Sequence, residues 1–169
     1  AYDRRTSADP STRPTVMPAS LIIGADRIVT NARIDVRNAF DHALVDTLSL
    51  AEEEHVDQAV AAARAVSKQP FPLHQRVHVL YEAADRLQAH AAEIADLLAQ
   101  EGSKTISEAR NEPKRAAEVL RMAAEVARTM HGESLPFDAR PGSEERVGYF
   151  VRKPLGVIAC ILPFNDPVA

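Results

Sequence analysis

The fold of this chain is decided by the stretch Pro154-Leu155-Gly156-Val157-Ile158-Ala159-Cys160-Ile161-Leu162-Pro163-Phe164-Asn165-Asp166-Pro167-Val168. Within it, residues 157–162 form a short apolar run between Gly156 and Pro163. Such a run predicts a strand that is buried on both faces of a parallel α/β sheet. Residues 164–167 then predict a tight turn at the carboxyl end of that strand, rich in turn-forming residues. Because ligands bind at this end of the strands in open α/β sheets, the turn is the first candidate for a functional site.

Short apolar segments open the folded part of the chain. Residues 21–23 and 27–29 flank Gly24-Ala25-Asp26, which predicts a hairpin turn. Two more short segments, residues 34–36 and 43–45, follow with turn residues between them. Together they predict a small antiparallel meander before the helices begin.

Apolar residues at helical spacing between residues 52 and 132 predict a group of helices. Ser49-Leu50-Ala51-Glu52 fits a capping box and predicts the start of the first of them. Gly102 is a natural helix end. A short helix is expected at residues 105–110, with Pro113 opening a new one, because a proline inside a helix costs about 3 kcal/mol.

Composition excludes several classes of protein. At 169 residues the chain is long enough for one domain with a core, and its net charge of −4 argues against a nucleic-acid partner. No apolar run approaches the length of a membrane span. The single cysteine excludes an internal disulfide, which favours a cytoplasmic location. Residues 1–19 are polar and contain prolines, so we expect a disordered lead-in there.

The order of these elements, together with the Pro-Leu-Gly-Val and Pro-Phe-Asn-x-Pro motifs quoted above, resembles the aldehyde dehydrogenase superfamily over residues 20–169. Glu101-Gly102-Ser103-Lys104 and Ser107-Glu108-Ala109-Arg110 resemble that family's E-x-G-K and E-A-R region, although Ser103 separates the glycine from the lysine. The resemblance implies an α/β fold, the N-terminal part of the cofactor-binding domain. Its elements are a meander, a helical group, an arm strand and the first strand of the nucleotide-binding sheet. It also implies that a segment at about residues 144–153 is an arm joining subunits in a homo-oligomer.

The resemblance assigns roles to the turn and to the residues before it. Asn165 matches the family's asparagine that donates to the oxyanion of the thiohemiacetal, and Ile161, Leu162, Pro163 and Phe164 match residues lining the nicotinamide end of NAD or NADP. From the residues alone, an Asx-turn residue is the better explanation of Asn165, and the resemblance reverses that preference. Ordinary packing of the strand end is compatible with contact to the cofactor. Asp166 replaces the apolar residue frequent after the asparagine, and either shapes the substrate entrance or extends the turn.

Cysteine and histidine provide no second chemistry. Cys160 lies inside the apolar run without a neighbouring His or Lys, so we expect a buried structural thiol rather than a nucleophile. His74 and His78 share a helix face, but no third ligand accompanies them, and no metal site is predicted.

The resemblance implies an NAD(P)+-dependent oxidoreductase that converts an aldehyde to a carboxylic acid. The family's nucleophilic cysteine, general base and phosphate-binding turn find no match in residues 1–169, so the chain resembles a truncated N-terminal third and is expected to be inactive by itself. The Phe-Asn-Asp-Pro variant resembles family members that act on small anionic aldehydes. The alternatives are a non-catalytic oligomerisation or binding module and a decayed fragment without activity.

Overall fold

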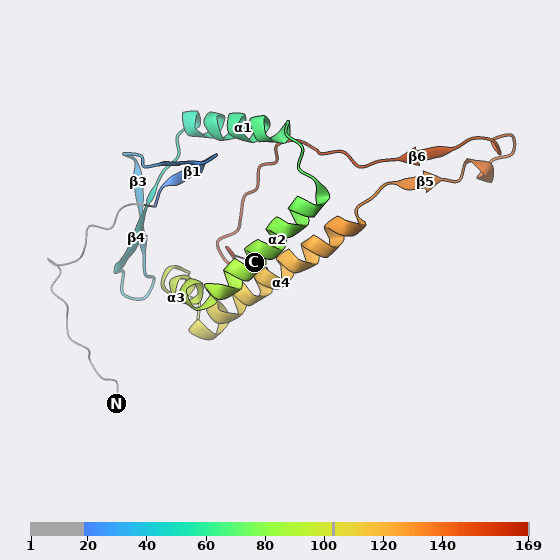
Figure 1. The fold of residues 1–169 in the computed structure, drawn as a ribbon. Coiled ribbons are helices and arrows are strands. Elements are labelled where there is room, and N and C mark those ends of the chain that lie inside the picture. Colours follow the sequence, from blue (N-terminus) through green and yellow to red (C-terminus); the bar gives the residue numbers. More distant parts are fainter. Residues whose placement is uncertain (1–18, 103, 169) are drawn as a thin grey trace. The chain divides into compact units, whose positions relative to one another are not determined.

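The chain divides into two units, residues 1–62 (the N-terminal unit) and residues 63–169 (the helical unit). The computed structural model describes residues 19–102 and 104–168, and Figure 1 follows their order along the sequence. Residues 1–18, where most of the expected lead-in lies, fall outside the described residues. Among the described helices, none combines the length and apolar character that crossing a membrane requires.

The N-terminal unit is built from two antiparallel hairpins. Strand β1 (Leu21–Ile23) pairs with β2 (Asp26–Ile28), and β3 (Arg33–Arg37) pairs with β4 (Leu44–Ser49). Gly24, at φ +62°, makes the first turn, which confirms the predicted hairpin. The four strands form two separate two-stranded sheets where the sequence predicted one meander.

Ser49 has a different role from the helix cap that the sequence predicted. It is the buried last residue of β4, and its Oγ accepts a hydrogen bond of 3.3 Å from the backbone N–H of Thr30. Helix α1 (Glu53–Ser67) starts four residues later, and the carbonyl of Glu52 accepts from the N–H of His55 at 3.0 Å. The capping-box prediction was wrong because pairing in the strand takes Ser49 out of reach of the helix.

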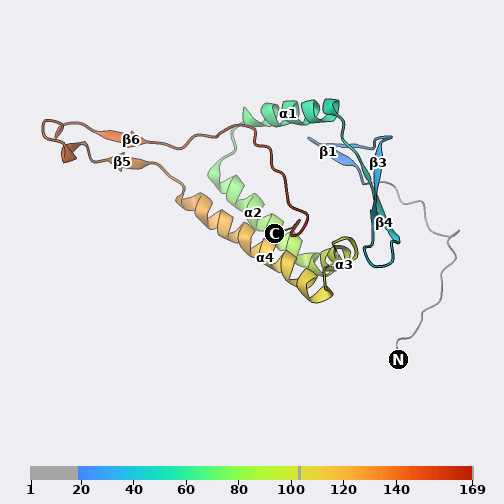
Figure 2. The same cartoon turned by 180° about the vertical axis from the view of Figure 1, so that it is seen from behind.

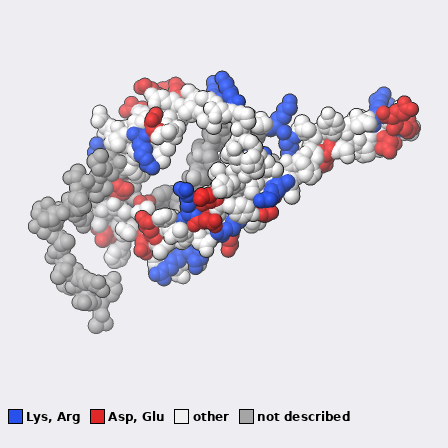
Figure 3. Space-filling model, viewed as in Figure 1, with Lys and Arg blue, Asp and Glu red and all other residues white. Residues whose placement is uncertain are grey.

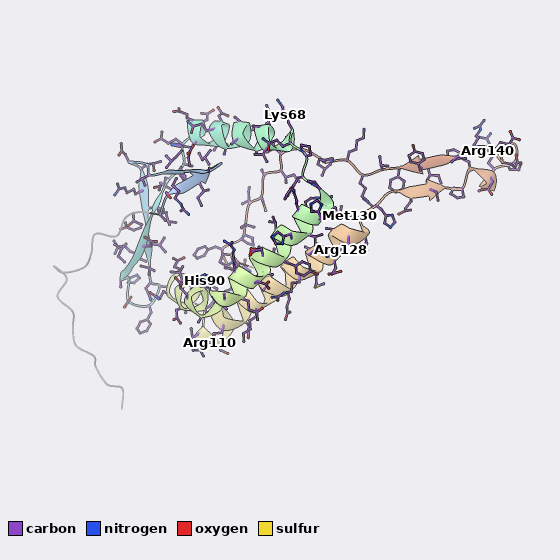
Figure 4. All side chains as sticks on the ribbon, viewed as in Figure 1. Lys68, His90, Arg110, Arg128, Met130 and Arg140 are labelled. Carbon is purple, nitrogen blue, oxygen red and sulfur yellow. The ribbon has the colours of Figure 1, made fainter. Side chains whose placement is uncertain are left out.

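The helical unit is centred on two long helices. Helix α2 (Leu73–Ala89) lies antiparallel beside α4 (Ile106–Thr129), and α3 (Ala91–Glu101) connects them at one end (Figures 1 and 2). Figure 4 places His90, after α2, near Arg110 at the start of α4, and Met130 at the far end. The buried positions on the two long helices are mostly alanines: Val77, Ala84, Ala109, Glu112, Pro113, Ala116, Ala117 and Ala124. Small side chains let the two backbones approach closely.

Polar contacts border this interface. The Tyr81 hydroxyl donates to a carboxylate oxygen of Glu125, and Arg121 donates to Asp85 at 2.9 Å and to Gln88 at 2.7 Å. The pKa of Tyr81 is raised, first by the hydrogen bond to Glu125 and then by desolvation. These contacts lie on the exposed border of the packing between α2 and α4.

Helix α4 is continuous where the sequence predicted two helices. Thr105 caps it, with Glu108 completing a capping box, and Pro113 lies inside it. Pro113 lacks the N–H of a regular helical residue, at a cost of about 3 kcal/mol. Its side chain is fully buried, and burial of an apolar side chain is worth roughly 1.5–3 kcal/mol, which offsets much of that cost. Tertiary packing therefore overrides the break that local sequence predicts.

A third hairpin follows α4. Strand β5 (Glu133–Leu135) pairs antiparallel with β6 (Gly148–Phe150), and β6 lies within residues 144–153. A Cβ at Gly148 would stand 1.9 Å from the ring of Phe137, so the close approach requires glycine. At the tip of this hairpin, Figure 3 shows gathered acidic side chains, among them Glu144 and Glu145.

The apolar run before the turn does not form the expected strand. Residues 151–163 belong to no helix or strand, and residues 157–162 are all exposed. A buried strand needs neighbours that accept and donate ladder hydrogen bonds, and none of the described strands pairs with this segment. The turn itself is confirmed: the chain turns at Phe164 and Asn165 and bends through Asp166 and Pro167.

The alanine interface predicts a sharp size limit. Ala84→Leu should destabilise the protein by about 1–3 kcal/mol, because Ala84 is fully buried and extra methylenes force α2 away from α4. Ala89→Leu, at the exposed last position of α2, is the matched control and should change stability by less than about 0.5 kcal/mol. Urea unfolding followed by circular dichroism measures both. Equal losses of unfolding free energy in the two variants would contradict close packing at Ala84.

Candidate functional site

The turn after residue 163 is attached to helix α4 through one carboxylate. Asp166 Oδ1 accepts from Lys104 Nζ at 2.5 Å, and its Oδ2 accepts from the Arg115 guanidinium at 2.6 Å. Lys104 Nζ also contacts a carboxylate oxygen of Glu112. We call Lys104, Glu112, Arg115 and Asp166 the Lys104 cluster. It joins residues that are 62 positions apart in the sequence.

Glu112 holds the cluster in place. Its side chain is only 2% exposed, so its charge requires a partner, and Lys104 provides it. The other carboxylate oxygen, Oε1, accepts from the backbone N–H of Val168 at 2.7 Å. One buried carboxylate thus binds both the lysine that holds Asp166 and the backbone two residues beyond Asp166.

The charges in the cluster stabilise one another. The pKa of Asp166 is lowered, first by the hydrogen bond from Lys104 and next by that from Arg115. The pKa of Lys104 is raised, mainly by the hydrogen bonds to Asp166 and Glu112. Lys104 is therefore a cation and Asp166 an anion across the neutral pH range.

The start of α4 places Lys104. Thr105 is the N-cap; its Oγ1 accepts from the N–H of Glu108 at 3.3 Å, and the Glu108 carboxylate accepts from the N–H of Thr105 at 3.1 Å. The hydrogen bonds from Thr105 also lower the pKa of Glu108, the side-chain bond contributing most. Since Glu108, Glu112 and Arg115 follow at helical spacing, they share one face of α4 with this start.

A depression of about 410 Å³ lies over this face. Its lining residues are nearly all charged or polar: Lys104, Glu108, Asn111, Glu112, Arg115 and Asp166. The Arg115 side chain is 57% exposed, and within residues 19–102 and 104–168 its one ion pair is with Asp166. Since a guanidinium carries five N–H donors, Arg115 retains donors for a further anion.

An apolar contact supports the turn beyond Asp166. Val168 packs against a small core formed by Ala95 and Leu98 of α3 and Ala109 of α4. The turn is therefore held by ion pairs at Asp166 and by burial at Val168, both on the helical unit.

The predicted site residues lie together in one exposed segment. Ile161, Leu162 and Phe164 are 96%, 67% and 66% exposed, and Pro163 and Asn165 are exposed as well. Asn165 directly precedes Asp166 in the chain. The ion pairs of the Asp166 carboxylate therefore also restrict where Asn165 can lie. Its role and those of residues 161–164 stay predictions.

Cys160 and the two histidines are also placed by the structure. Cys160 is exposed, so the predicted burial is not found; the strand neighbours that would cover it are absent from the described part of the chain. His74 lines a second depression of about 420 Å³ with Leu73, Val77 and Arg128. Within residues 19–102 and 104–168, no three His, Cys, Asp or Glu side chains are grouped so that they could hold a metal ion.

Sequence reasoning missed Glu112 and Arg115. Lys104 was noted as part of a motif, but its contact with Asp166 was not foreseen. A signal was present in the spacing: Glu108, Glu112 and Arg115 recur every three or four residues, which puts them on one helix face. What that face meets is not readable from local sequence.

Comparison with known proteins gives consistent relatives. The model of the "Aldehyde dehydrogenase family" matches residues 28–169. The chain is 38% identical over 148 residues to a 3-sulfolactaldehyde dehydrogenase of Priestia megaterium, covering 88% of this chain and 31% of the relative. It is also 38% identical over 144 residues to aspartate-semialdehyde dehydrogenase 1 of Pseudomonas canavaninivorans, covering 83% of this chain and 30% of that relative.

Solved structures agree. The NADP-dependent glyceraldehyde-3-phosphate dehydrogenase of Bacillus halodurans C-125, complexed with NADP, superimposes with a TM-score of 0.84 at 29% identity, over 90% of this chain and 33% of that protein. An NAD-dependent benzaldehyde dehydrogenase of Corynebacterium glutamicum superimposes with a TM-score of 0.66 at 25% identity, over 74% of this chain and 28% of that protein. The chain spans about a third of the length of these proteins.

The Lys104 cluster predicts a pH dependence of stability. The folded-state pKa of Asp166 is lowered, so its contribution is fully present above the unfolded value of about 3.9 and is lost as pH falls through the folded value. The difference in unfolding free energy between wild type and Asp166→Asn should therefore be constant from pH 7 to 5 and shrink below about pH 4. Urea unfolding at each pH measures it. A difference that persists unchanged into strong acid would contradict the ion pairs.

Proposed function

The chain belongs to the aldehyde dehydrogenase family, and we propose that it is the N-terminal part of an enzyme that oxidises an aldehyde to a carboxylic acid with NAD+ or NADP+. The family match over residues 28–169 carries this proposal. The turn that bears Asn165 and its attachment to α4 support it. Since the chain spans about 31% of its curated relatives, the activity is that of the whole enzyme.

Asn165 is the proposed catalytic residue of this part. A thiolate from elsewhere in the enzyme adds to the aldehyde carbon, and the carbonyl oxygen takes up the negative charge. The Asn165 side-chain N–H donates to that oxygen and stabilises the charge in the transition state. Bound NAD(P)+ would supply the hydride acceptor for this step, and water would then release the carboxylic acid.

Residues 161–164 are the proposed contacts with the nicotinamide. Their apolar side chains are exposed, and no described strand uses their backbone groups. An exposed apolar segment beside a polar turn fits a planar ring that is apolar on its faces and carries a carboxamide. These residues would bind and orient the ring next to Asn165.

The substrate class follows from the charges. Relatives of this chain are named for 3-sulfolactaldehyde, sulfoacetaldehyde, aspartate semialdehyde and malonate semialdehyde, each of which carries a sulfonate or carboxylate group. Arg115 retains free donors at the mouth of the depression, beside the turn. We therefore propose a short aldehyde with an anionic group, bound through Arg115.

A cytoplasmic homo-oligomer completes the proposal. Strand β6 has one partner, β5, and the nearby Val147, Tyr149 and Val151 are 91%, 74% and 61% exposed. An exposed strand edge with apolar side chains favours pairing with another chain, which fits an arm at residues 144–153. The same surface favours the second candidate function, a non-catalytic oligomerisation module.

Activity separates the two candidates. The full-length protein that contains this sequence should produce NADH or NADPH only when an aldehyde is present, and should prefer sulfonate- or carboxylate-bearing aldehydes to neutral ones of equal length. The 169-residue chain by itself should produce none. If the full-length protein oxidises none of the aldehydes tested, the non-catalytic oligomerisation module is favoured.

Arg115→Gln in the full-length enzyme tests the substrate class. It should lower kcat/KM about tenfold or more further for the anionic aldehyde than for a neutral one, because one charge-assisted hydrogen bond to the anion is lost, whereas loosening of the turn through Asp166 lowers both values alike. Arg110→Gln, an exposed arginine of the same helix, is the matched control and should leave both values unchanged. An equal loss for both substrates would refute recognition of the anion by Arg115.

Asn165→Ala in the full-length enzyme should lower kcat about 10²–10³-fold, because one oxyanion donor is removed. Coenzyme binding, measured by fluorescence titration, should change little. Asn31→Ala, an exposed asparagine of the N-terminal unit, serves as the control for the substitution itself. An unchanged kcat would return Asn165 to the role of an ordinary turn residue.

A further inference from the structure

We propose that Asp166 is a positioning residue that sets the location of the Asn165 amide by fixing the turn to helix α4. The inference deepens the proposed function and rests on it for the role of Asn165. Neither alternative considered from the sequence, a substrate entrance or a simple turn residue, accounts for the contacts observed.

The first argument is the use of both carboxylate oxygens. Asp166 Oδ1 binds Lys104 at 2.5 Å, and Oδ2 binds Arg115 at 2.6 Å. Two cations on different oxygens fix the rotation of the carboxylate as well as its position, which a single ion pair does not. The backbone of residue 166 is thereby held in one orientation, and Asn165 is the residue directly before it.

The second argument is the rigidity of what Asp166 binds. Lys104 is 17% exposed and also pairs with the buried Glu112 of α4. Arg115 lies on the same helix, three residues beyond Glu112, and so on the same face. Arg115 is therefore part of a capped, packed helix, and Lys104, which directly precedes the N-cap Thr105, is held to that helix by its pair with Glu112.

The third argument is a second attachment two residues further on. The N–H of Val168 donates to Glu112 Oε1 at 2.7 Å, and the Val168 side chain packs against the core of Ala95, Leu98 and Ala109. Residue 167 is thereby fixed from both sides, and the turn that bears Asn165 is held at its C-terminal end. Asn165, by contrast, is exposed, and within the described ranges no hydrogen bond occupies its amide, which leaves it available to a ligand.

The consequence is kinetic. Displacing a catalytic group by about 1 Å can cost on the order of 10²-fold in rate. Loosening residue 166 should therefore lower kcat without removing any group that contacts the coenzyme. A purely structural role of Asp166 would instead lower stability and leave kcat of the folded enzyme unchanged.

The test compares Asp166→Asn with Asp85→Asn in the full-length enzyme. Asp85→Asn breaks the Arg121–Asp85 pair of 2.9 Å, another Asp–Arg contact to α4, outside the Lys104 cluster. Two quantities are measured: amide hydrogen exchange over residues 164–168, and kcat with the KM for NAD(P)+. The expected result for Asp166→Asn is faster exchange at these amides and a kcat reduced at least about tenfold, with the coenzyme KM within about twofold. Asp85→Asn should change neither quantity.

The proposal is overturned if exchange at residues 164–168 stays at the wild-type rate, or if it rises while kcat is unchanged. Should Asp166→Asn fail to fold, Arg115→Gln removes only the exposed cation. Faster exchange at residues 164–168 in that variant supports the proposal, and wild-type exchange overturns it. A wild-type protein without aldehyde oxidation refutes the proposed function, whereas the exchange measurement still decides whether Asp166 fixes the turn.

Discussion

The buried carboxylate of Glu112 is the constraint on which the rest of the site depends. The Glu112 side chain is only 2% exposed, so its negative charge must be compensated inside the protein. Lys104 pairs with one of its oxygens, and the N–H of Val168 donates a hydrogen bond to the other. Lys104 then has a hydrogen-bond donor left for Asp166, which brings in Arg115. A single buried charge thus attaches a turn to a helix whose contacting residues are 51 and 56 positions away in sequence.

The sequence correctly predicts the local secondary structure of several segments. The Gly24 hairpin, the helical group and the turn at residues 164–167 all follow from short-range rules that hold whatever surrounds them. The failures share a different cause. Ser49 was assigned to a helix cap although it pairs in a strand, and Pro113 was assigned to a helix start although burial keeps α4 continuous. In both cases a tertiary contact outweighed a local preference of a few kcal/mol or less.

The candidate site was predictable only in part. The Pro-Phe-Asn motif identified Asn165, because the motif is contiguous. The Lys104–Asp166 ion pair spans 62 positions, and periodicity carries no information about which helix face meets which turn. Residues 157–162 illustrate the converse: their composition predicts a buried strand, but burial also requires neighbours. Exposed apolar segments of this kind are typical of surfaces that pack against another part of a protein.

The Lys104 cluster therefore links the fold to the proposed chemistry. Helix α4 is capped, packed against α2 and continuous through Pro113, and these features make it a rigid support for the turn. The central claim is that Lys104 and Asp166 interact directly and thereby hold this turn. A double-mutant cycle with Lys104→Met and Asp166→Asn, measured by urea unfolding at neutral pH and low salt, tests it most directly. The account predicts that the double variant loses clearly less stability than the two single variants combined. Strictly additive losses would contradict it.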